Sequence, residues 1–359
     1  MRSKLAGGNV NEYLEKIDKI NKLKVSHRNW CESFEMTYIL MLSASIGDVI
    51  CITGPSRSGK SRLAKTLAGI FSSEFEFEET GFIPAVFVEA VNDSQYGAFS
   101  TKSFALRILK ALKHPKYGTD EFQESAQSGR ISETVYRNSL VNGLKNRKTK
   151  YLFVDESQHT EYARKSSEVA LAVMDSWKSM ANDADIILVI IGAYPILEIT
   201  RKSNHLVGRR YLVHLKRYMK NLEDVREFAV IVSSFGKAIG EEEVLVDNLD
   251  ILHKGSLGCI GLLKKWLIKA LAHSFVKNKK LSRKILIETI STDDDLRGAS
   301  AEILSGEKLL QSTFFQELLS EGKIVDIEET AVKLKKGAKP GNRKPARLKL
   351  NNRLGGDNE

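Results

Sequence analysis

The sequence predicts an α/β protein in which a parallel sheet is flanked by helices and followed by a small helical domain. Four short runs, at 48–53, 82–91, 151–156 and 185–192, are apolar nearly throughout, which is typical of strands buried on both faces. Segments with helical periodicity alternate with these runs, for example at 100–113 and 165–181. Beyond about residue 215 the strand pattern fades, and "LEDVREFAVIVSSFGKAI" and "CIGLLKKWLIKALAHSF" have helical periodicity.

The chain ends differ in character from this core. Residues 1–26 form a polar extension that we expect to be partly helical. Ser26 is a possible N-cap of an amphipathic helix, because Trp30, Phe34 and Tyr38 follow it at helical spacing. We expect the following boundaries: the α/β core at 27–215, a helical lid at 216–290, a helical C-terminal segment at 291–330, and a basic, disordered tail at 331–359.

The net charge of +10 is concentrated in that tail. It holds nine Lys or Arg residues against two acidic residues, so the rest of the chain is close to neutral. Charge alone is therefore a weak argument for nucleic-acid binding by the folded body. No stretch approaches the roughly 18 apolar residues of a membrane span, the N-terminus lacks the apolar region of a secretory signal, and the three cysteines lack metal-site spacing. We expect a cytoplasmic protein without a membrane partner.

The segment "GPSRSGKS" at 54–61 matches the phosphate-binding pattern G-x-x-x-x-G-K-[ST] between a predicted strand and a predicted helix. Its glycines allow several backbone N–H groups to point inward, where the positive helix end adds to an anion site. Lys60 would reach the β- and γ-phosphates, and the Ser61 hydroxyl would hold Mg²⁺. A chance match in a glycine turn is the alternative, and the strand–loop–helix context argues against it. The predicted nucleotide-binding residues are Gly54, Pro55, Ser56, Arg57, Ser58, Gly59, Lys60, Ser61 and Asp155.

Two adjacent carboxylates end the third predicted strand, "YLFVDE". Asp155 can contact Mg²⁺ directly or through water if this strand lies near the one that feeds the loop, so Ser61 and Asp155 are the predicted metal ligands. The alternative for Asp155 is a strand-end cap. Glu156 stands where many P-loop ATPases polarise the attacking water, and the alternative is a solvated or ion-paired glutamate.

Arg209 and Arg210 follow the fourth predicted strand. Either could act as an arginine finger on the nucleotide of a neighbouring subunit, where it would stabilise charge on the transferring phosphoryl group. A pair of surface arginines is an equally good interpretation. We therefore list Glu156, Arg209 and Arg210 as candidate catalytic residues and leave the choice between the arginines open.

The order of the phosphate-binding loop, "VDESQH", "VIIGAY" and "RRY" resembles that of AAA+ ATPases. The segments "FIPAVFVEA", "FALRILKALKHP", "YLFVDESQHT" and "LVGRRYLVHLKRY" further resemble the TnsC/TniB family of transposition ATPases, over roughly 27–290. This resemblance implies a protein that binds ATP and assembles as a ring or filament on double-stranded DNA. It also implies that the protein recruits or activates transposase subunits together with a target-selection protein or complex. Gln158 and His159 carry part of the resemblance and could relay the nucleotide state.

Two departures from the family pattern imply slow, regulatory hydrolysis. The end of the fourth strand usually carries a polar sensor, but here that position holds Ala193 or Tyr194, and neither is an amide donor. A second sensor arginine is also missing near "GSLGCIGLLKKW", where Lys264 and Lys265 are the nearest cations. Both departures favour a switch over a motor.

The resemblance places the DNA-facing part of the core after the second strand, and a second basic cluster precedes the third strand. A solvated surface is the alternative for each cation. A protein that encircles DNA needs cations that neutralise phosphates with little base readout. The candidate DNA contacts are Thr101, Lys102, Lys116, Lys148 and Lys150, with Lys145 and Arg147 in the same second cluster. The basic tail could contact DNA or the transposase, and the sequence does not separate these functions.

Two further functions are also compatible with the sequence. One is another AAA+ activity, such as a helicase loader or a replication initiator, although no winged-helix pattern follows the predicted lid. The other is a phosphotransferase acting on a small molecule, which would not need an acidic pair followed by a double arginine.

Overall fold

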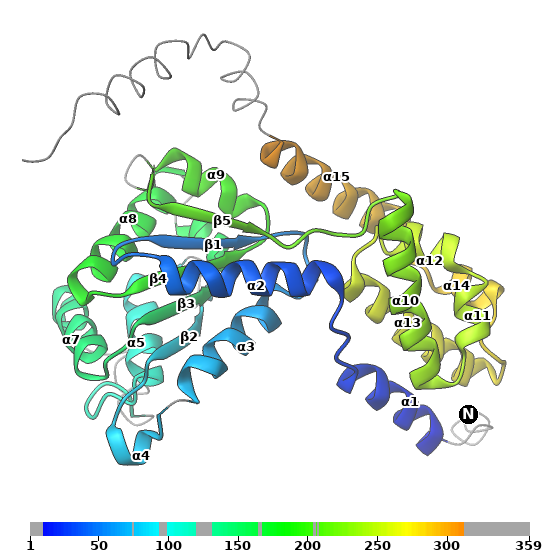
Figure 1. Cartoon of the computed structure of the whole chain (residues 1–359), viewed down its shortest axis with the longest axis horizontal. Helices are drawn as coiled ribbons and strands as arrows, with labels where there is room; N and C mark the ends of the chain where they lie inside the picture. Colours follow the sequence, from blue (N-terminus) through cyan, green and yellow to red (C-terminus); the bar gives the residue numbers. More distant parts are fainter. Residues whose placement is uncertain are drawn as a thin grey trace, which may run out of the picture. The chain divides into compact units, whose positions relative to one another are not determined.

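The computed structural model describes residues 10–73, 75–92, 99–119, 131–163, 167–203, 206 and 208–311 (Figure 1). The predicted tail at 331–359, and residues 312–330 of the predicted segment at 291–330, lie outside these ranges. Five parallel strands form one sheet in the order β2–β3–β4–β1–β5. Their bounds are β1 Val49–Thr53, β2 Ala85–Glu89, β3 Tyr151–Asp155, β4 Ile187–Gly192 and β5 Arg210–His214.

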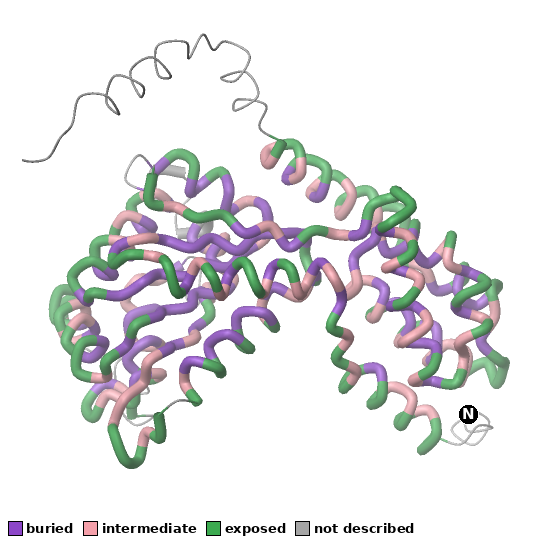
Figure 2. Tube along the Cα trace, viewed as in Figure 1, coloured by how far each residue is buried: buried purple, intermediate pink, exposed green. Residues whose placement is uncertain are grey.

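The first four strands fall within three residues of the predicted bounds, and the predicted α/β class is confirmed. The strand β5 was not predicted. It lies at the edge of the sheet beside β1, and Tyr211 and Leu212 are exposed there. A half-exposed strand lacks the continuous apolar run that marks a strand buried on both faces. The three central strands β1, β3 and β4 are buried along their whole length (Figure 2).

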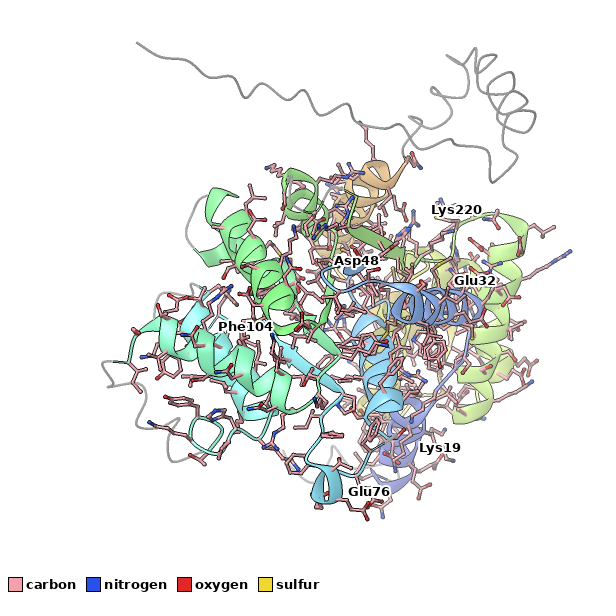
Figure 3. All side chains as sticks on the ribbon, turned by 60° about the vertical axis from the view of Figure 1, so that its left-hand side comes forward. Lys19, Glu32, Asp48, Glu76, Phe104 and Lys220 are labelled. Atoms are coloured by element: carbon pink, nitrogen blue, oxygen red, sulfur yellow. The ribbon has the colours of Figure 1, made fainter. Side chains whose placement is uncertain are left out.

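Helices cover both faces of the sheet. α2 (Arg28–Ser43) and α3 (Lys60–Ser72) pack on one face, against Ile52, Phe153 and Val189 among others. α5 (Thr101–Ala111), α7 (Glu133–Asn146) and α8 (Ser167–Ala184) pack on the other face. Figure 3 marks the two layers by Glu32 on α2 and Phe104 on α5. Short elements complete this part: α4 (Phe77–Thr80), the 3-10 helix η2 (Ser157–Ala163) and α9 (Pro195–Lys202).

The N-cap of α2 differs from the predicted one. The cap residue is His27, whose Nδ1 accepts a hydrogen bond from the Trp30 backbone N–H at 3.4 Å. The His27 ring also lies 2.9 Å from the Tyr218 hydroxyl, in the segment that leads out of the sheet. This tertiary contact explains why His27 is the cap, although Ser26 is the better N-cap by residue type.

The helical part follows β5 and has its own core. It contains α10 (Leu222–Ile239), α11 (Glu242–Val246), α12 (Leu249–Gly255), α13 (Ile260–Lys277) and α14 (Arg283–Thr289). The N-terminal helix α1 (Val10–Lys22) packs against α10 and α13, with Ile20 fully buried in the same apolar cluster. The predicted polar extension therefore joins this bundle. No helix in the described ranges is long and apolar enough to cross a membrane.

The last helix within the described residues, α15 (Asp293–Leu310), contacts both the sheet part and the helical part. Its residue Ile303 packs with Tyr194 and Leu197 at the end of the sheet and with Cys259 at the start of α13. The guanidinium of Arg217 makes a bidentate ion pair with Glu307, at 2.8 and 3.0 Å. Both of these side chains are only 14% exposed, which makes the pair the best-sheltered anchor of α15.

Candidate functional site

The loop between β1 and α3 is the centre of the candidate site. It holds the residues 54–61 at the carboxyl end of β1, as the strand–loop–helix prediction requires. The Lys60 amine is buried and donates hydrogen bonds to the carbonyl oxygens of Gly54 at 3.0 Å and Pro55 at 2.8 Å. Burial lowers the pKa of Lys60, and the Glu156 and Asp155 carboxylates oppose this shift. These two carbonyls hold the amine on the inner side of the loop.

Asp155 ends β3 two strands away from β1, with β4 between them. Its carboxylate is buried, is hydrogen-bonded to the Ser61 side chain, and accepts the Glu156 backbone N–H at 2.9 Å. Burial raises the pKa of Asp155 although both hydrogen bonds oppose the rise. A buried carboxylate of this kind gains most from a cation, so the structure brings the two predicted metal ligands together.

A pocket of about 720 Å³ opens in front of this loop. The loop lines it with Lys60, Ser61 and neighbouring residues, Glu156, Gln158 and Ala193 line it from the ends of β3 and β4, and α13 lines it from the helical part. Its cations outnumber its carboxylates: they are Arg57, Lys60, Arg62, Lys264 and Lys265. A pocket with this charge suits a polyanion such as a nucleoside triphosphate.

Unpaired polar atoms support the same assignment. The hydroxyl oxygens of Ser58, in the loop, and Thr53, at the end of β1, are buried without a hydrogen-bond partner among the described residues. Buried polar groups are rarely left unpaired, so these two hydroxyls point to a missing ligand or water. In the described part of the chain no three His, Cys, Asp or Glu side chains cluster as a metal site. Mg²⁺ is commonly held by one or two protein ligands together with phosphates and water, and Ser61 and Asp155 would fit that role.

The helix α13 approaches the loop so closely that only glycine fits at the contact. The Gly261 N–H donates to the Arg57 carbonyl at 3.1 Å, and a Cβ at this position would lie 2.1 Å from that oxygen. One turn further, Lys264 and Lys265 both line the pocket, and Lys264 also donates to the Asn21 carbonyl at the end of α1, at 2.9 Å. The two lysines named in place of a sensor arginine therefore differ in availability.

Glu156 lies at a turn that orients its side chain. It has a positive φ of 54°, and its carboxylate accepts a hydrogen bond from the Gln158 amide nitrogen at 2.5 Å. The Gln158 amide oxygen in turn accepts the Ala193 backbone N–H at 3.2 Å. His159 Nδ1 lies 2.9 Å from the Ala90 carbonyl, and its Nε2 lies 4.0 Å from the Glu156 carboxylate.

The two candidate arginines lie at the opposite end of the sheet from the pocket. Arg210 pairs with Val49 at the start of β1, four positions along the strand from the end that carries the loop. At about 3.3 Å per residue this places them about 13 Å from the pocket end. Arg210 is half-buried and donates to the Thr200 hydroxyl at 2.8 Å, whereas Arg209 is exposed. Of the two, Arg209 is the more exposed to solvent.

The candidate DNA contacts fall into two groups. Thr101 and Lys102 begin α5, on the side of the sheet where the strands end, whereas Lys116 follows α5 and lies on the side where they begin. Lys148 and Lys150 precede β3 on that same side, and both are exposed, as is Lys116. Arg147 of the same cluster is committed to structure, because it donates to three backbone carbonyls, those of Gly81, Leu112 and Lys113. The five candidates therefore do not form one continuous patch.

Two functional features were not predicted from the sequence. The link from Glu156 through Gln158 to the end of β4 depends on which strands are neighbours, although the proximity of Gln158 to the acidic pair was a visible signal. The docking of α15 beside the loop, where Glu302 lies 3.5 Å from the Ser56 hydroxyl, had no local signal.

Comparison with known proteins agrees with this geometry. Residues 46–199, which contain β1 to β4, the loop and the acidic pair, match the family model of an AAA domain. No curated protein sequence matched the chain.

Two solved structures share the fold. The ORC2 protein of Aeropyrum pernix, solved as ADPNP and ADP complexes, superposes with a TM-score of 0.52 at 17% identity and covers 74% of this chain and 68% of its own. Cdc6p of Pyrobaculum aerophilum superposes with a TM-score of 0.50 at 14% identity, covering 78% and 73% respectively. At these identities the likeness concerns the fold. Residues 46–199 are thus similar to an AAA domain, and the chain has an AAA+ P-loop fold that continues into a helical C-terminal region.

Proposed function

We propose that this protein is an ATPase that acts as a nucleotide-controlled switch on DNA. The observation that carries the proposal is one pocket that collects Lys60, Ser61 and Glu156, with Asp155 hydrogen-bonded to Ser61 behind them. The solved ORC2 structure with the same fold carries ADPNP and ADP, which supports adenine nucleotides as the ligand.

Each of these side chains has a distinct part in the proposed reaction. Lys60 would exchange the two loop carbonyls for phosphate oxygens. The Ser61 hydroxyl and the Asp155 carboxylate would hold Mg²⁺, which would neutralise phosphate charge. Glu156 lines the pocket with its side chain 45% exposed, and it accepts a proton from the attacking water.

Completion of the site requires a second copy of the chain. Arg209 is exposed and lies at the far end of the sheet, so it cannot reach the pocket of its own subunit. Supplied to a neighbour, its guanidinium would stabilise charge on the transferring phosphoryl group. Arg210, bonded to Thr200, instead holds α9 to the edge strand. We infer that Arg209 is the arginine finger and that the active form is an oligomer.

The DNA part of the proposal draws on the sequence resemblance. The resemblance to TnsC/TniB ATPases favours a regulator of transposition that assembles on target DNA and recruits a transposase. A second candidate, a replication initiator or helicase loader, is supported by the shared fold with ORC2 and Cdc6p. In both cases the exposed Lys116, Lys148 and Lys150 are the better supported DNA contacts, because they lie on one side of the sheet.

The first experiment measures ATP hydrolysis of the wild type with and without duplex DNA. We expect slow turnover that depends on Mg²⁺, and loss of turnover with retained ATP binding in Glu156→Gln. Electron microscopy with ATP should show oligomers on duplex DNA, and DNA affinity should fall steeply as salt increases. Monomers under all conditions, or hydrolysis unaffected by Glu156→Gln, would contradict the proposal.

A second experiment separates the two candidate functions. Purified protein with ATP and DNA is added to a transposase of the same organism and, in parallel, to its replicative helicase. Stimulated strand transfer supports the transposition role. ATP-dependent loading of the helicase, without an effect on strand transfer, supports the initiator or loader role.

A further inference from the structure

The end of β4 supplies no polar side chain to the pocket. Ala193 lines the pocket with a methyl group, and Tyr194 is buried with its hydroxyl 3.0 Å from His214 Nε2. A side-chain amide nevertheless lies between this strand end and Glu156, and it comes from Gln158 in η2. The pocket therefore obtains its amide from a residue two positions after Glu156.

Both ends of this amide have a defined partner. The backbone N–H of Ala193 can only donate, so it must face the amide oxygen of Gln158, and the 3.2 Å contact fits this orientation. The amide nitrogen then faces the Glu156 carboxylate, at 2.5 Å. The hydrogen bonds thus fix the orientation of the amide, and with it one oxygen of Glu156.

The backbone leaves just enough room for this arrangement. A Cβ at Gly192 would lie 2.5 Å from the Gln158 amide oxygen, so a side chain at Gly192 would displace the amide. Glu156 itself has the left-handed φ of 54°, and its N–H is bonded to Asp155. A non-glycine residue adopts this conformation rarely, which indicates that the surrounding contacts determine the direction of its side chain.

We propose that Gln158 is a positioning residue that holds the Glu156 carboxylate in a fixed position relative to the end of β4. This inference rests on the proposed ATP hydrolysis, in which Glu156 accepts a proton from water. The bond from Gln158 occupies one carboxylate oxygen and leaves the other for water. Because Ala193 anchors the amide, a movement at the end of β4 changes the direction of Glu156. The amide thereby connects the pocket wall opposite the loop to the residue that activates water.

The test replaces the amide while keeping the size of the side chain. Gln158→Met removes both hydrogen bonds and should lower kcat for ATP hydrolysis roughly 10- to 100-fold, because a misdirected base loses much of its advantage. The affinity for a fluorescent ATP analogue should change less than about threefold, because Gln158 makes no contact with Lys60, Ser61 or Asp155 among its hydrogen bonds. Gly192→Ala should lower kcat in the same direction by displacing the amide. Gln311→Met, at an exposed position, is the matched control.

The split between kcat and nucleotide affinity distinguishes positioning from a merely structural role. A positioning residue lowers kcat with little change in nucleotide affinity, whereas a change that disrupts the structure of the pocket lowers both together.

The outcomes separate this inference from the proposed function. A wild type without ATPase activity would overturn both. If the wild type hydrolyses ATP and Glu156→Gln does not, but Gln158→Met keeps kcat within twofold, only the role of Gln158 is wrong. Loss of nucleotide affinity equal to the loss of kcat would also overturn it, since a positioning residue acts after binding.

Discussion

The ion pair between Arg217 and Glu307 offers a quantitative test of how α15 is held. The two side chains form parallel contacts of 2.8 and 3.0 Å, and each is 14% exposed. Coulomb's law at an effective dielectric constant near 20 gives a gross attraction of about 6 kcal/mol at this distance. Desolvation and side-chain ordering cancel more than half of it, so we expect a coupling free energy of about 2 kcal/mol.

A double-mutant cycle with Arg217→Ala, Glu307→Ala and the double variant measures this coupling. Each single change leaves a sheltered charge unpaired and should destabilise the docking of α15 by about 3 kcal/mol, and the double variant should lose about 1 kcal/mol more than either single variant. Hydrogen exchange of α15 amides should accelerate roughly 30-fold for every 2 kcal/mol by which the docking of α15 is destabilised. The matched control is the pair of Lys22 and Asp18, which is 77% and 55% exposed and should couple by only about 0.3–0.5 kcal/mol. A coupling below about 0.5 kcal/mol for Arg217 and Glu307 would refute the reasoning.

Three further predictions concern binding, pH and assembly. Lys60→Ala should weaken ATP binding at least about tenfold, since it removes the buried cation of the loop, and isothermal titration with ATP and Mg²⁺ measures this directly. Burial, together with the Arg62 charge, lowers the pKa of His27 from 6.5 to about 4, so only the unfolded chain gains this proton as the pH falls through that window. The free energy of unfolding should therefore fall by about 2 kcal/mol between pH 6.5 and 5. Urea titrations of His27→Gln should lack this contribution. Arg209→Ala should abolish hydrolysis in the oligomer, and mixing it with Glu156→Gln should restore part of the activity because each supplies what the other lacks; Arg210→Ala should mainly lower the melting temperature. A monomeric ATPase unaffected by Arg209→Ala would contradict the assignment.

The sheet could be predicted from the sequence because burial on both faces leaves a continuous apolar run. Four of its five strands have that run, whereas the edge strand β5 begins with Arg210 and exposes Tyr211 and Leu212. The docking of α1 could not be predicted either, because nothing in a helix with a single fully buried residue, Ile20, identifies its distant partners. Its partners, α10 and α13, follow more than 190 residues later.

Some residues of the candidate site could likewise be predicted from the sequence, and others could not. The phosphate-binding loop is one contiguous segment, and its pattern implies the backbone shape, so Lys60 and Ser61 could be placed from the sequence. Asp155 could be placed because parallel strands bring their carboxyl ends to one edge. Gln158 could not, since its partner Ala193 belongs to the neighbouring strand and the bond depends on register. The DNA candidates after the second strand were chosen from the resemblance and those before the third strand from charge, and neither criterion says on which side of a sheet a residue lies.

The position of α15 has a thermodynamic consequence for nucleotide binding. It contacts Tyr194 at the end of β4, Cys259 at the start of α13 and, through Glu307, Arg217 in the segment between the sheet and the helical bundle. If bound nucleotide turns α13 relative to the sheet, at least one of these contacts must change, and α15 then binds more or less tightly. Linkage is reciprocal, so a protein or DNA that lifts α15 must change the nucleotide affinity by the same factor. The helix can thus report the state of the pocket to a partner that never touches the nucleotide.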